Sequence, residues 1–145
     1  MWILIHLRRA GVSEGHLIKI YKALIRPIIE YACQLYHHML NCDQSATIES
    51  LQRRTLKIIS PPGTSYGAAL EKFGVPRLED RRKQLCLKFA LKAAENPRYV
   101  DWFPLNHELG TVLRHRNKYV EKFACTERRM NSPIFMMRKL LNAAI

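Results

Sequence analysis

The acidic residues of this chain do not form a pattern that could bind catalytic metal ions. A site for two metal ions needs neighbouring carboxylates, because the ions lie only about 4 Å apart. Asp43, Asp80 and Asp101 are far apart in the sequence. Glu79 is adjacent to Asp80, but this pair suits the first turn of a helix, where carboxylates meet the positive end of the helix dipole. No phosphate-binding glycine loop, nucleophile elbow or Rossmann glycine pattern is present, so we expect no catalytic residue and no cofactor.

Histidine and cysteine side chains are the remaining candidate ligands. His37 and His38 lie near Cys42, which follows His38 by one helical turn. A structural zinc site takes four ligands, so this set does not complete one. None of the cysteines forms a Cys-x-x-Cys pair: they are Cys33, Cys42, Cys86 and Cys125. A chain of 145 residues is large enough to fold without disulfides, so we expect free thiols and no metal.

Positive charge is the strongest feature of the composition. The chain has 24 Lys and Arg against 12 Asp and Glu, a formal net charge of +12. Residues 51–92 hold ten basic and three acidic side chains, and residues 114–145 hold eight and two. Such blocks favour a polyanionic partner, and nucleic acid is favoured over a membrane because no basic helix has an unpaired aromatic face. The alternative is that these charges form a solvated surface without a partner.

The apolar runs are short and interrupted by charge. The longest near the start, Trp2 to Ile5, is soon followed by Arg8 and Arg9. A signal peptide and a membrane-spanning helix both need longer apolar runs, so we expect neither. The expected location is intracellular, either nuclear or cytoplasmic.

A long amphipathic helix is predicted from His16 to Leu40, after a helix cap at Ser13. Pro27 lacks the N–H that would bond the carbonyl of Ala23, so we expect a kink or break there. Apolar side chains recur every three or four residues and predict one buried face: Leu17, Ile20, Tyr21, Leu24, Ile28, Tyr31, Leu35 and Met39.

Five further helices are predicted, over residues 1–10, 44–59, 66–73, 78–95 and 134–143. Asp43 is the expected cap of the helix over 44–59. The inner face of that helix is predicted to carry Ile48, Leu51, Thr55 and Ile58, and its outer face Gln52, Arg53, Arg54 and Lys57. In the helix over 78–95, the inner face is predicted to carry Leu78, Leu85, Cys86, Phe89 and Ala93, and the outer face Arg77, Arg81, Gln84, Lys88 and Lys92.

Residues 98–126 show no clean helical period and are predicted to be irregular. Tyr119, Phe123 and Cys125 alternate with charged residues there, which allows a short strand. We therefore expect an all-α fold, a bundle of about five helices with an irregular segment before the last one. Residues 1–97 would form the bundle, and the tail over 98–145 would pack on the same core.

Four stretches resemble the C-terminal part of a non-LTR retrotransposon reverse transcriptase. They are IYKALIRPIIEYACQLYH (Ile20–His37), IESLQRRTLKII (Ile48–Ile59), LEDRRKQLCLKFA (Leu78–Ala90) and NSPIFMMRKLLN (Asn131–Asn142), in the family's order and spacing. The resemblance implies that residues 1–97 are a thumb-like bundle that holds a template–primer duplex by its backbone. The palm with its paired catalytic aspartates, the fingers and the endonuclease are missing, which implies a fragment of an RNA-directed DNA polymerase without a polymerase site.

The expected function is thus a nucleic-acid-binding helical module. The expected partner is the backbone of an RNA–DNA hybrid or of duplex DNA, and a second is the missing palm and fingers of a longer polymerase. Some candidate contacts have acidic neighbours, Glu30, Glu49 and Glu79, that they could pair with instead. The alternative function is a structural remnant or a protein-interaction module. The candidate nucleic-acid contacts are Lys22, Arg26, Arg53, Arg54, Lys57, Arg81 and Arg82, which the resemblance carries over, and Lys88 and Lys92, which helical spacing adds.

Overall fold

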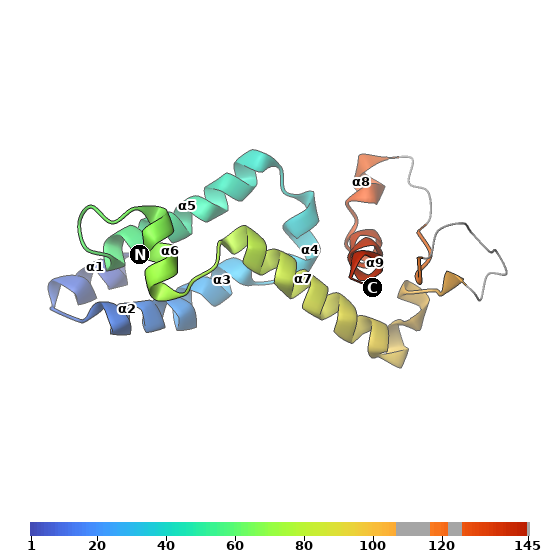
Figure 1. The fold of residues 1–145 in the computed structure, drawn as a ribbon, viewed down its shortest axis with the longest axis horizontal. Helices are drawn as coiled ribbons and strands as arrows, with labels where there is room; N and C mark the ends of the chain where they lie inside the picture. The colour runs from blue at the N-terminus through green and yellow to red at the C-terminus, as the bar shows by residue number, and fades with distance from the viewer. Residues whose placement is uncertain (107–116, 122–125, 145) are drawn as a thin grey trace. The chain divides into compact units, whose positions relative to one another are not determined.

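The structure, a computed structural model, describes residues 1–106, 117–121 and 126–144. These residues form helices joined by turns, with one isolated antiparallel bridge between Leu105 and Tyr119 (Figure 1). The predicted all-α class is therefore confirmed for the described chain. No helix in the described part is both long and apolar enough to cross a membrane.

Contacts between residues divide the chain into two units. The first contains Met1–Tyr31 and Leu40–Arg81, and the second contains Ala32–Met39 and Arg82–Ile145. The sequence suggests a different division, after residue 97, and that division stays a prediction.

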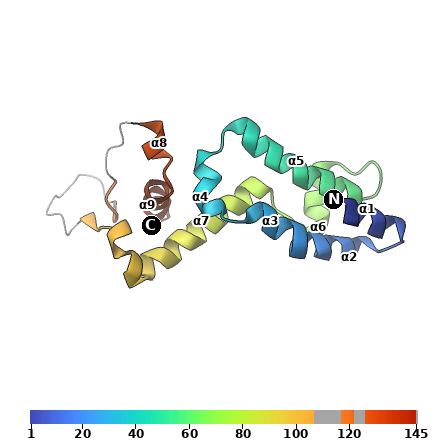
Figure 2. The same cartoon turned by 180° about the vertical axis from the view of Figure 1, so that it is seen from behind.

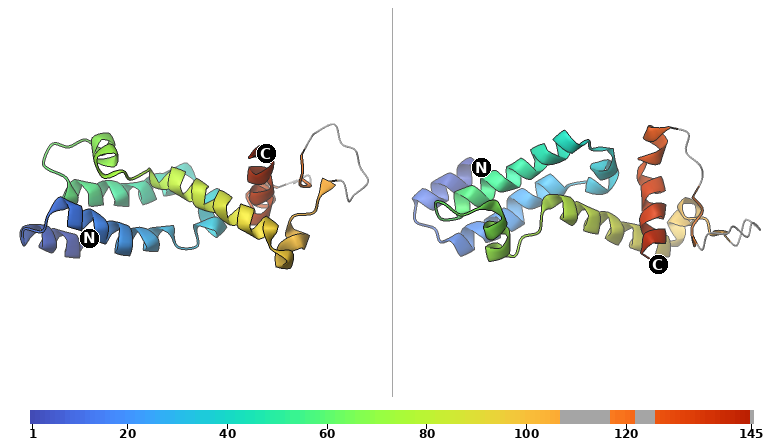
Figure 3. Two further views of the ribbon diagram at one scale, coloured as in Figure 1. Left: turned by 60° about the horizontal axis from the view of Figure 1, so that its bottom comes forward. Right: turned by 45° about the horizontal axis from the view of Figure 1, so that its top comes forward.

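The first unit is built around α5, the longest helix that lies wholly within it. Residues of α1, α2 and α6 all contact α5, and Figures 1 and 2 show α1 and α6 gathered near its C-terminal end. Figure 3 shows α5 running back alongside α2 and α3 in the opposite direction. The elements of this unit are α1 (Trp2–Arg9), α2 (Glu14–Ile20), the π-helix η1 (Tyr21–Ile25), α3 (Arg26–Glu30), α5 (Cys42–Ile59), α6 (Tyr66–Phe73) and the start of α7 (Leu78–Glu95).

The ends of these helices follow local sequence signals. Gly11 after α1 and Gly74 after α6 have φ of 81° and 55°, which glycine adopts without a steric penalty. The Ser65 hydroxyl accepts a 3.3 Å hydrogen bond from the backbone N–H of Ala68 and so caps α6. The bounds of α6 and α7 agree with the prediction.

The helix predicted from His16 to Leu40 is divided, as the expected break implies, but the break follows Glu30 rather than lying at Pro27, and this is the main correction to the predicted fold. The helix passes from α2 into the π-helix η1, and Pro27 lies in the first turn of α3 that follows. It then ends at Glu30, and Ala32 has a left-handed φ of 51°. A π-turn holds more residues than an α-turn, so side chains beyond η1 are rotated about the helix axis from their predicted direction.

The predicted apolar face is accordingly buried only in its first part. Leu17 and Tyr21, before and at the start of η1, are 1% and 0% exposed. The predicted burial of five later residues is wrong, since all are exposed: Leu24, Ile28, Tyr31, Leu35 and Met39.

Helix α5 begins earlier than predicted and turns a different face inward. Asn41, rather than Asp43, caps it, because the Asn41 side chain accepts from the N–H of Gln44 and the Gln44 side chain accepts from the N–H of Asn41. Leu51 is exposed, and the predicted inner face is rotated by about one residue. The buried residues of α5 are Gln52, Thr55, Leu56 and Ile59.

The second unit has its own apolar core. The C-terminal part of α7 supplies Ala90 and Ala93, and α9 supplies Met137 and Leu141. Phe89, predicted to face inward, is 37% exposed. Besides part of α7, this unit contains α4 (Cys33–Tyr36), the 3-10 helices η2 (His37–Met39) and η3 (Pro97–Trp102), α8 (Glu127–Met130) and α9 (Pro133–Ala143).

The bridge at Tyr119 is held to α9 by an amide side chain. Asn142 accepts from the N–H of Tyr119 and donates to its carbonyl, both at 3.0 Å. Of the residues in the predicted strand, Phe123 and Cys125 lie outside the described residues. Helix α8 is a short helix that the sequence did not predict.

Candidate nucleic-acid interface

The candidate contacts fall into both units. Lys22, Arg26, Arg53, Arg54, Lys57 and Arg81 belong to the first unit, and Arg82, Lys88 and Lys92 to the second. Lys88 and Lys92 are exposed on α7, as predicted from their spacing.

Three of the first-unit cations are held by neighbouring groups of the fold. The Lys22 ammonium donates a 3.0 Å hydrogen bond to the carbonyl of Phe73, at the C-terminal end of α6. Arg26 and Arg81 lie on either side of Glu30, with their Nε atoms 3.5 and 3.4 Å from its Oε1. The Glu30 side chain is only 11% exposed, so solvent screens these ion pairs weakly. The alternative that some candidates pair with Glu30 is thus confirmed for two of them.

Arg82 lies in the interior and is 0% exposed. Its Nε donates toward His37 Nδ1 at 3.4 Å. A buried guanidinium cannot meet a phosphate in this structure, so the structure corrects its assignment as a surface contact. A sequence signal was present, because Arg82 stands four residues after Leu78 and four before Cys86, both of which are 0% exposed.

Arg53, Arg54 and Lys57 form an exposed row along α5, which we call the α5 row. None of the three forms an ion pair with any described residue. The Arg53 guanidinium carbon lies 5.1 Å from the centre of the Tyr66 ring, which orients that cation by a cation–π contact. These side chains are therefore available to an anion.

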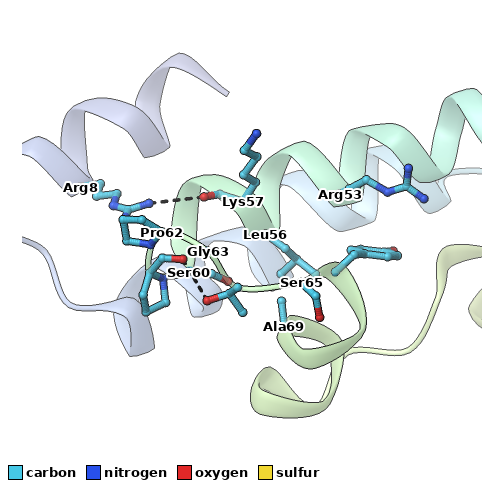
Figure 4. A pocket seen from close by; sticks show the side chains of 12 residues that line it. Arg8, Arg53, Leu56, Lys57, Ser60, Pro62, Gly63, Ser65 and Ala69 are labelled. Atoms are coloured by element: carbon cyan, nitrogen blue, oxygen red, sulfur yellow. Dashed lines mark hydrogen bonds between the residues drawn. The ribbon is translucent and has the colours of Figure 1, made fainter.

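An open pocket with a volume of about 620 Å³ lies beside the α5 row (Figure 4). It is formed by α1, the C-terminal part of α5, the loop over residues 60–65 and the first turn of α6. Three of its lining residues are cationic and none is acidic. The cations are Arg8, Arg53 and Lys57. The full set of lining residues is Arg8, Arg53, Leu56, Lys57, Ser60, Pro61, Pro62, Gly63, Thr64, Ser65, Tyr66 and Ala69.

Arg8 is a pocket residue that sequence reasoning missed. Its Nη1 donates to the carbonyl of Lys57 at 3.4 Å and to that of Ile58, as Figure 4 shows for Lys57. These carbonyls belong to the last turn of α5, where backbone acceptors lack partners within the helix. The sequence shows that Arg8 belongs to a basic pair at the end of a helix. It does not show that Arg8 contacts the end of a helix about 50 residues later.

Tyr66 lines the pocket and packs against the apolar core of the first unit. Its hydroxyl donates to Glu49 and accepts a 3.0 Å hydrogen bond from the Gln52 side chain. Burial and the hydrogen bond to Glu49 raise the pKa of Tyr66 to about 12. The phenol is therefore neutral at physiological pH, and the pocket carries the charge of its cations alone.

No group of three His, Cys, Asp or Glu side chains in the described chain is placed to hold a metal ion. The rings of His37 and His38 lie 4.9 Å apart, and Cys42 belongs to the first unit, whereas both histidines belong to the second. Cys33, Cys42 and Cys86 are free thiols, as predicted.

No family model matches the chain, and no curated protein and no solved structure is similar to it.

Proposed function

We propose that this chain is a nucleic-acid-binding helical module without a polymerase site of its own, derived from the thumb region of a non-LTR retrotransposon reverse transcriptase. The observation that supports binding is the α5 row, three exposed cations that lack an acidic partner among the described residues, beside a pocket lined by cations and no acid. The resemblance of four sequence stretches supports the origin.

Such a surface would bind the phosphate backbone rather than the bases. Lys and Arg neutralise phosphates and release condensed counterions, so affinity falls as salt rises. Backbone contacts orient a protein on a duplex but read no sequence. Binding to an RNA–DNA hybrid or to duplex DNA of unrelated sequences should therefore be similar in strength.

The test is a salt titration of duplex binding by the full chain and by a variant with Arg53, Arg54 and Lys57 all changed to Gln. For every phosphate that the variant no longer neutralises, the slope of log affinity against log salt should become shallower by roughly 0.9 on duplex DNA. A matched control changes Lys19, Arg128 and Arg129, which are exposed elsewhere, to Gln and so removes the same net charge.

The control variant should keep the wild-type slope. Equal slopes for wild type and the α5-row variant, with both folded by circular dichroism, would assign the α5 row to solvent. If the slope of log affinity against log salt becomes equally shallow in both variants, binding follows net charge rather than this surface.

We also expect that the purified chain extends no primer. The sequence lacks an aspartate pair for two metal ions, and polymerisation would need such a pair. Incorporation of nucleotides on a primed template with Mg²⁺, above the level of a reaction without protein, would refute this part of the proposal.

A protein-interaction module is the second candidate function. It is favoured by exposed apolar side chains on η1 and beyond it, since Leu24, Ile28 and Tyr31 are 59%, 76% and 80% exposed. The expected partner would be the palm and fingers of a longer polymerase. This function would be favoured over the first if the chain binds no duplex at low salt but binds a separately purified palm-and-fingers fragment, and if Ile28→Ser abolishes that binding.

A further inference from the structure

We propose that the pocket between α1, α5 and α6 is a site for a terminal phosphoryl group, taken from the end of a nucleic-acid strand. The inference deepens the proposed function and rests on it for the source of the phosphoryl group. Three independent features of the pocket point to an anion: its cations, a buried serine hydroxyl and a helix N-terminus without an acidic residue.

Two of the three cations are held in place before any anion binds. Arg8 is fixed by the carbonyls of Lys57 and Ile58, and Arg53 by the ring of Tyr66. Charged side chains that are already oriented lose less conformational freedom on binding. The lining carries a charge of +3 and no carboxylate that would compete with an anion.

Ser60 supplies a donor that the fold does not use. The residue is 2% exposed and lines the pocket, and its hydroxyl has no hydrogen-bond partner among the described residues. A buried hydroxyl without a partner costs free energy. Because a serine hydroxyl rotates about one bond, it can turn to an oxygen placed in the pocket.

The first turn of α6 forms another side of the pocket. This turn contains no acidic residue, although acidic side chains are favoured at helix starts. Ser65 caps it, and the Thr64 hydroxyl fixes the preceding loop by donating to the carbonyl of Pro61 at 2.9 Å. The positive end of a helix dipole favours a phosphate, as in known anion sites.

The shape of the site favours the end of a strand over its middle. Internal phosphodiesters lie on the convex surface of a duplex, with a sugar on each side, and cannot enter a concave pocket to reach a buried residue such as Ser60. A terminal phosphate carries an additional oxygen and charge and projects beyond the last sugar. A pocket of about 620 Å³ is within the usual range for small-ligand sites and can accept such a group with part of its nucleoside.

The first experiment titrates the ¹⁵N-labelled full chain with inorganic phosphate, against chloride at equal ionic strength. Amide shifts should concentrate at residues 60–68. The second compares duplexes that differ only in a 5′-phosphate or 5′-hydroxyl end. The phosphorylated duplex should bind about tenfold more tightly, the size expected of charge-assisted hydrogen bonds.

Matched variants on the same helix locate the effect. Arg53→Gln and Ser60→Ala should remove most of the preference for the phosphorylated end. Arg54→Gln and Ser50→Ala should keep it, because Arg54 and Ser50 do not line the pocket. The amide spectra show directly whether each variant is folded.

The outcomes separate this inference from the proposed function. Equal affinity for both ends with salt-dependent duplex binding would overturn the pocket assignment and leave backbone binding standing. If inorganic phosphate shifts the amides of residues 60–68 but no duplex binds, the anion pocket is supported and nucleic acid is overturned as the source of the phosphoryl group. A preference for the phosphorylated end that survives Arg53→Gln and Ser60→Ala would place the terminal phosphate elsewhere.

Discussion

The hydroxyl of Tyr21 donates a 2.5 Å hydrogen bond to Oε1 of Gln52, and both residues are 0% exposed. Burial raises the pKa of Tyr21 well above its usual range, so the hydroxyl stays protonated and able to donate. The other end of the Gln52 amide donates to Tyr66 Oη and to the carbonyl of Pro76, each at 3.0 Å. One side chain thus joins α5 to η1, to α6 and to the turn before α7.

Gln52→Leu should therefore destabilise the protein strongly. The change leaves the Tyr21 hydroxyl and the Pro76 carbonyl without their partner, and each buried unsatisfied group costs about 1–3 kcal/mol. Urea denaturation measures the decrease in stability. As a control, Gln84→Leu changes an exposed glutamine on α7 and should stay within about 0.5 kcal/mol of wild type. Similar midpoints for both variants would show that the buried hydrogen bonds contribute little.

Glycine should fit position 32 better than the native alanine does. Its φ of 51° is in the left-handed region, which costs an L-residue about 1 kcal/mol and glycine almost nothing. Ala32→Gly should therefore raise the free energy of unfolding by several tenths of a kcal/mol to about 1 kcal/mol, despite the greater freedom of the unfolded chain. Ala23→Gly, at an exposed helical position, should lower it by about 1 kcal/mol. A change of the same sign in both variants, measured by urea denaturation, would contradict the left-handed conformation of Ala32.

His38 should make stability depend on pH. Burial lowers the pKa of His38 below its usual value of 6.5, and its Nε2 is buried without a hydrogen-bond partner among the described residues. The unfolded chain then binds the proton at a higher pH than the folded chain does. Stability should fall as pH drops below about 6.5 toward the folded-state pKa and should be unaffected by this group at higher pH. In His38→Asn, the slope of unfolding free energy against pH should be smaller between about pH 5 and 7. An unchanged slope would show that His38 is not the source of the pH dependence.

The thiols should differ sharply in reactivity. Cys33 and Cys86 are 0% exposed, and burial raises the pKa of Cys86 to about 12, whereas Cys42 is exposed. Because the thiolate is the reactive form, a maleimide should label Cys42 first and the other two only after unfolding. A Cys125→Ser background removes the cysteine that lies outside the described residues. Mass spectrometry of the native protein that finds Cys86 labelled as fast as Cys42 would contradict its burial.

The sequence predicted helices best where their ends carry distinctive residues. Helices α6 and α9 follow the signals of Ser65, Gly74 and Pro133, which act through local backbone geometry. Such signals need no knowledge of distant contacts. For the same reason the break at Ala32 was missed, since alanine is a good helix former and nothing local marks it.

The inward face of a helix was harder to predict than its ends. In α5, apolar residues occur on both sides, so Leu51 and Leu56 each fit a buried face. The buried amide of Gln52 decides between them, and its partners come from three other parts of the chain. Of the three cations in the pocket, Arg53 and Lys57 were candidates that the family resemblance carried over. Arg8 was not, because its role depends on a contact 50 residues away.

The carboxylate of Glu49 accepts a 3.1 Å hydrogen bond from the backbone N–H of Leu78, the first residue of α7. The first amides of a helix have no partner within it, and helix ends ordinarily fray on fast timescales. Here that amide is bonded to a helix 29 residues earlier in the chain. Its exchange with solvent deuterium should therefore require Glu49 to release it, so that the start of α7 opens together with its contact to α5 rather than by fraying alone.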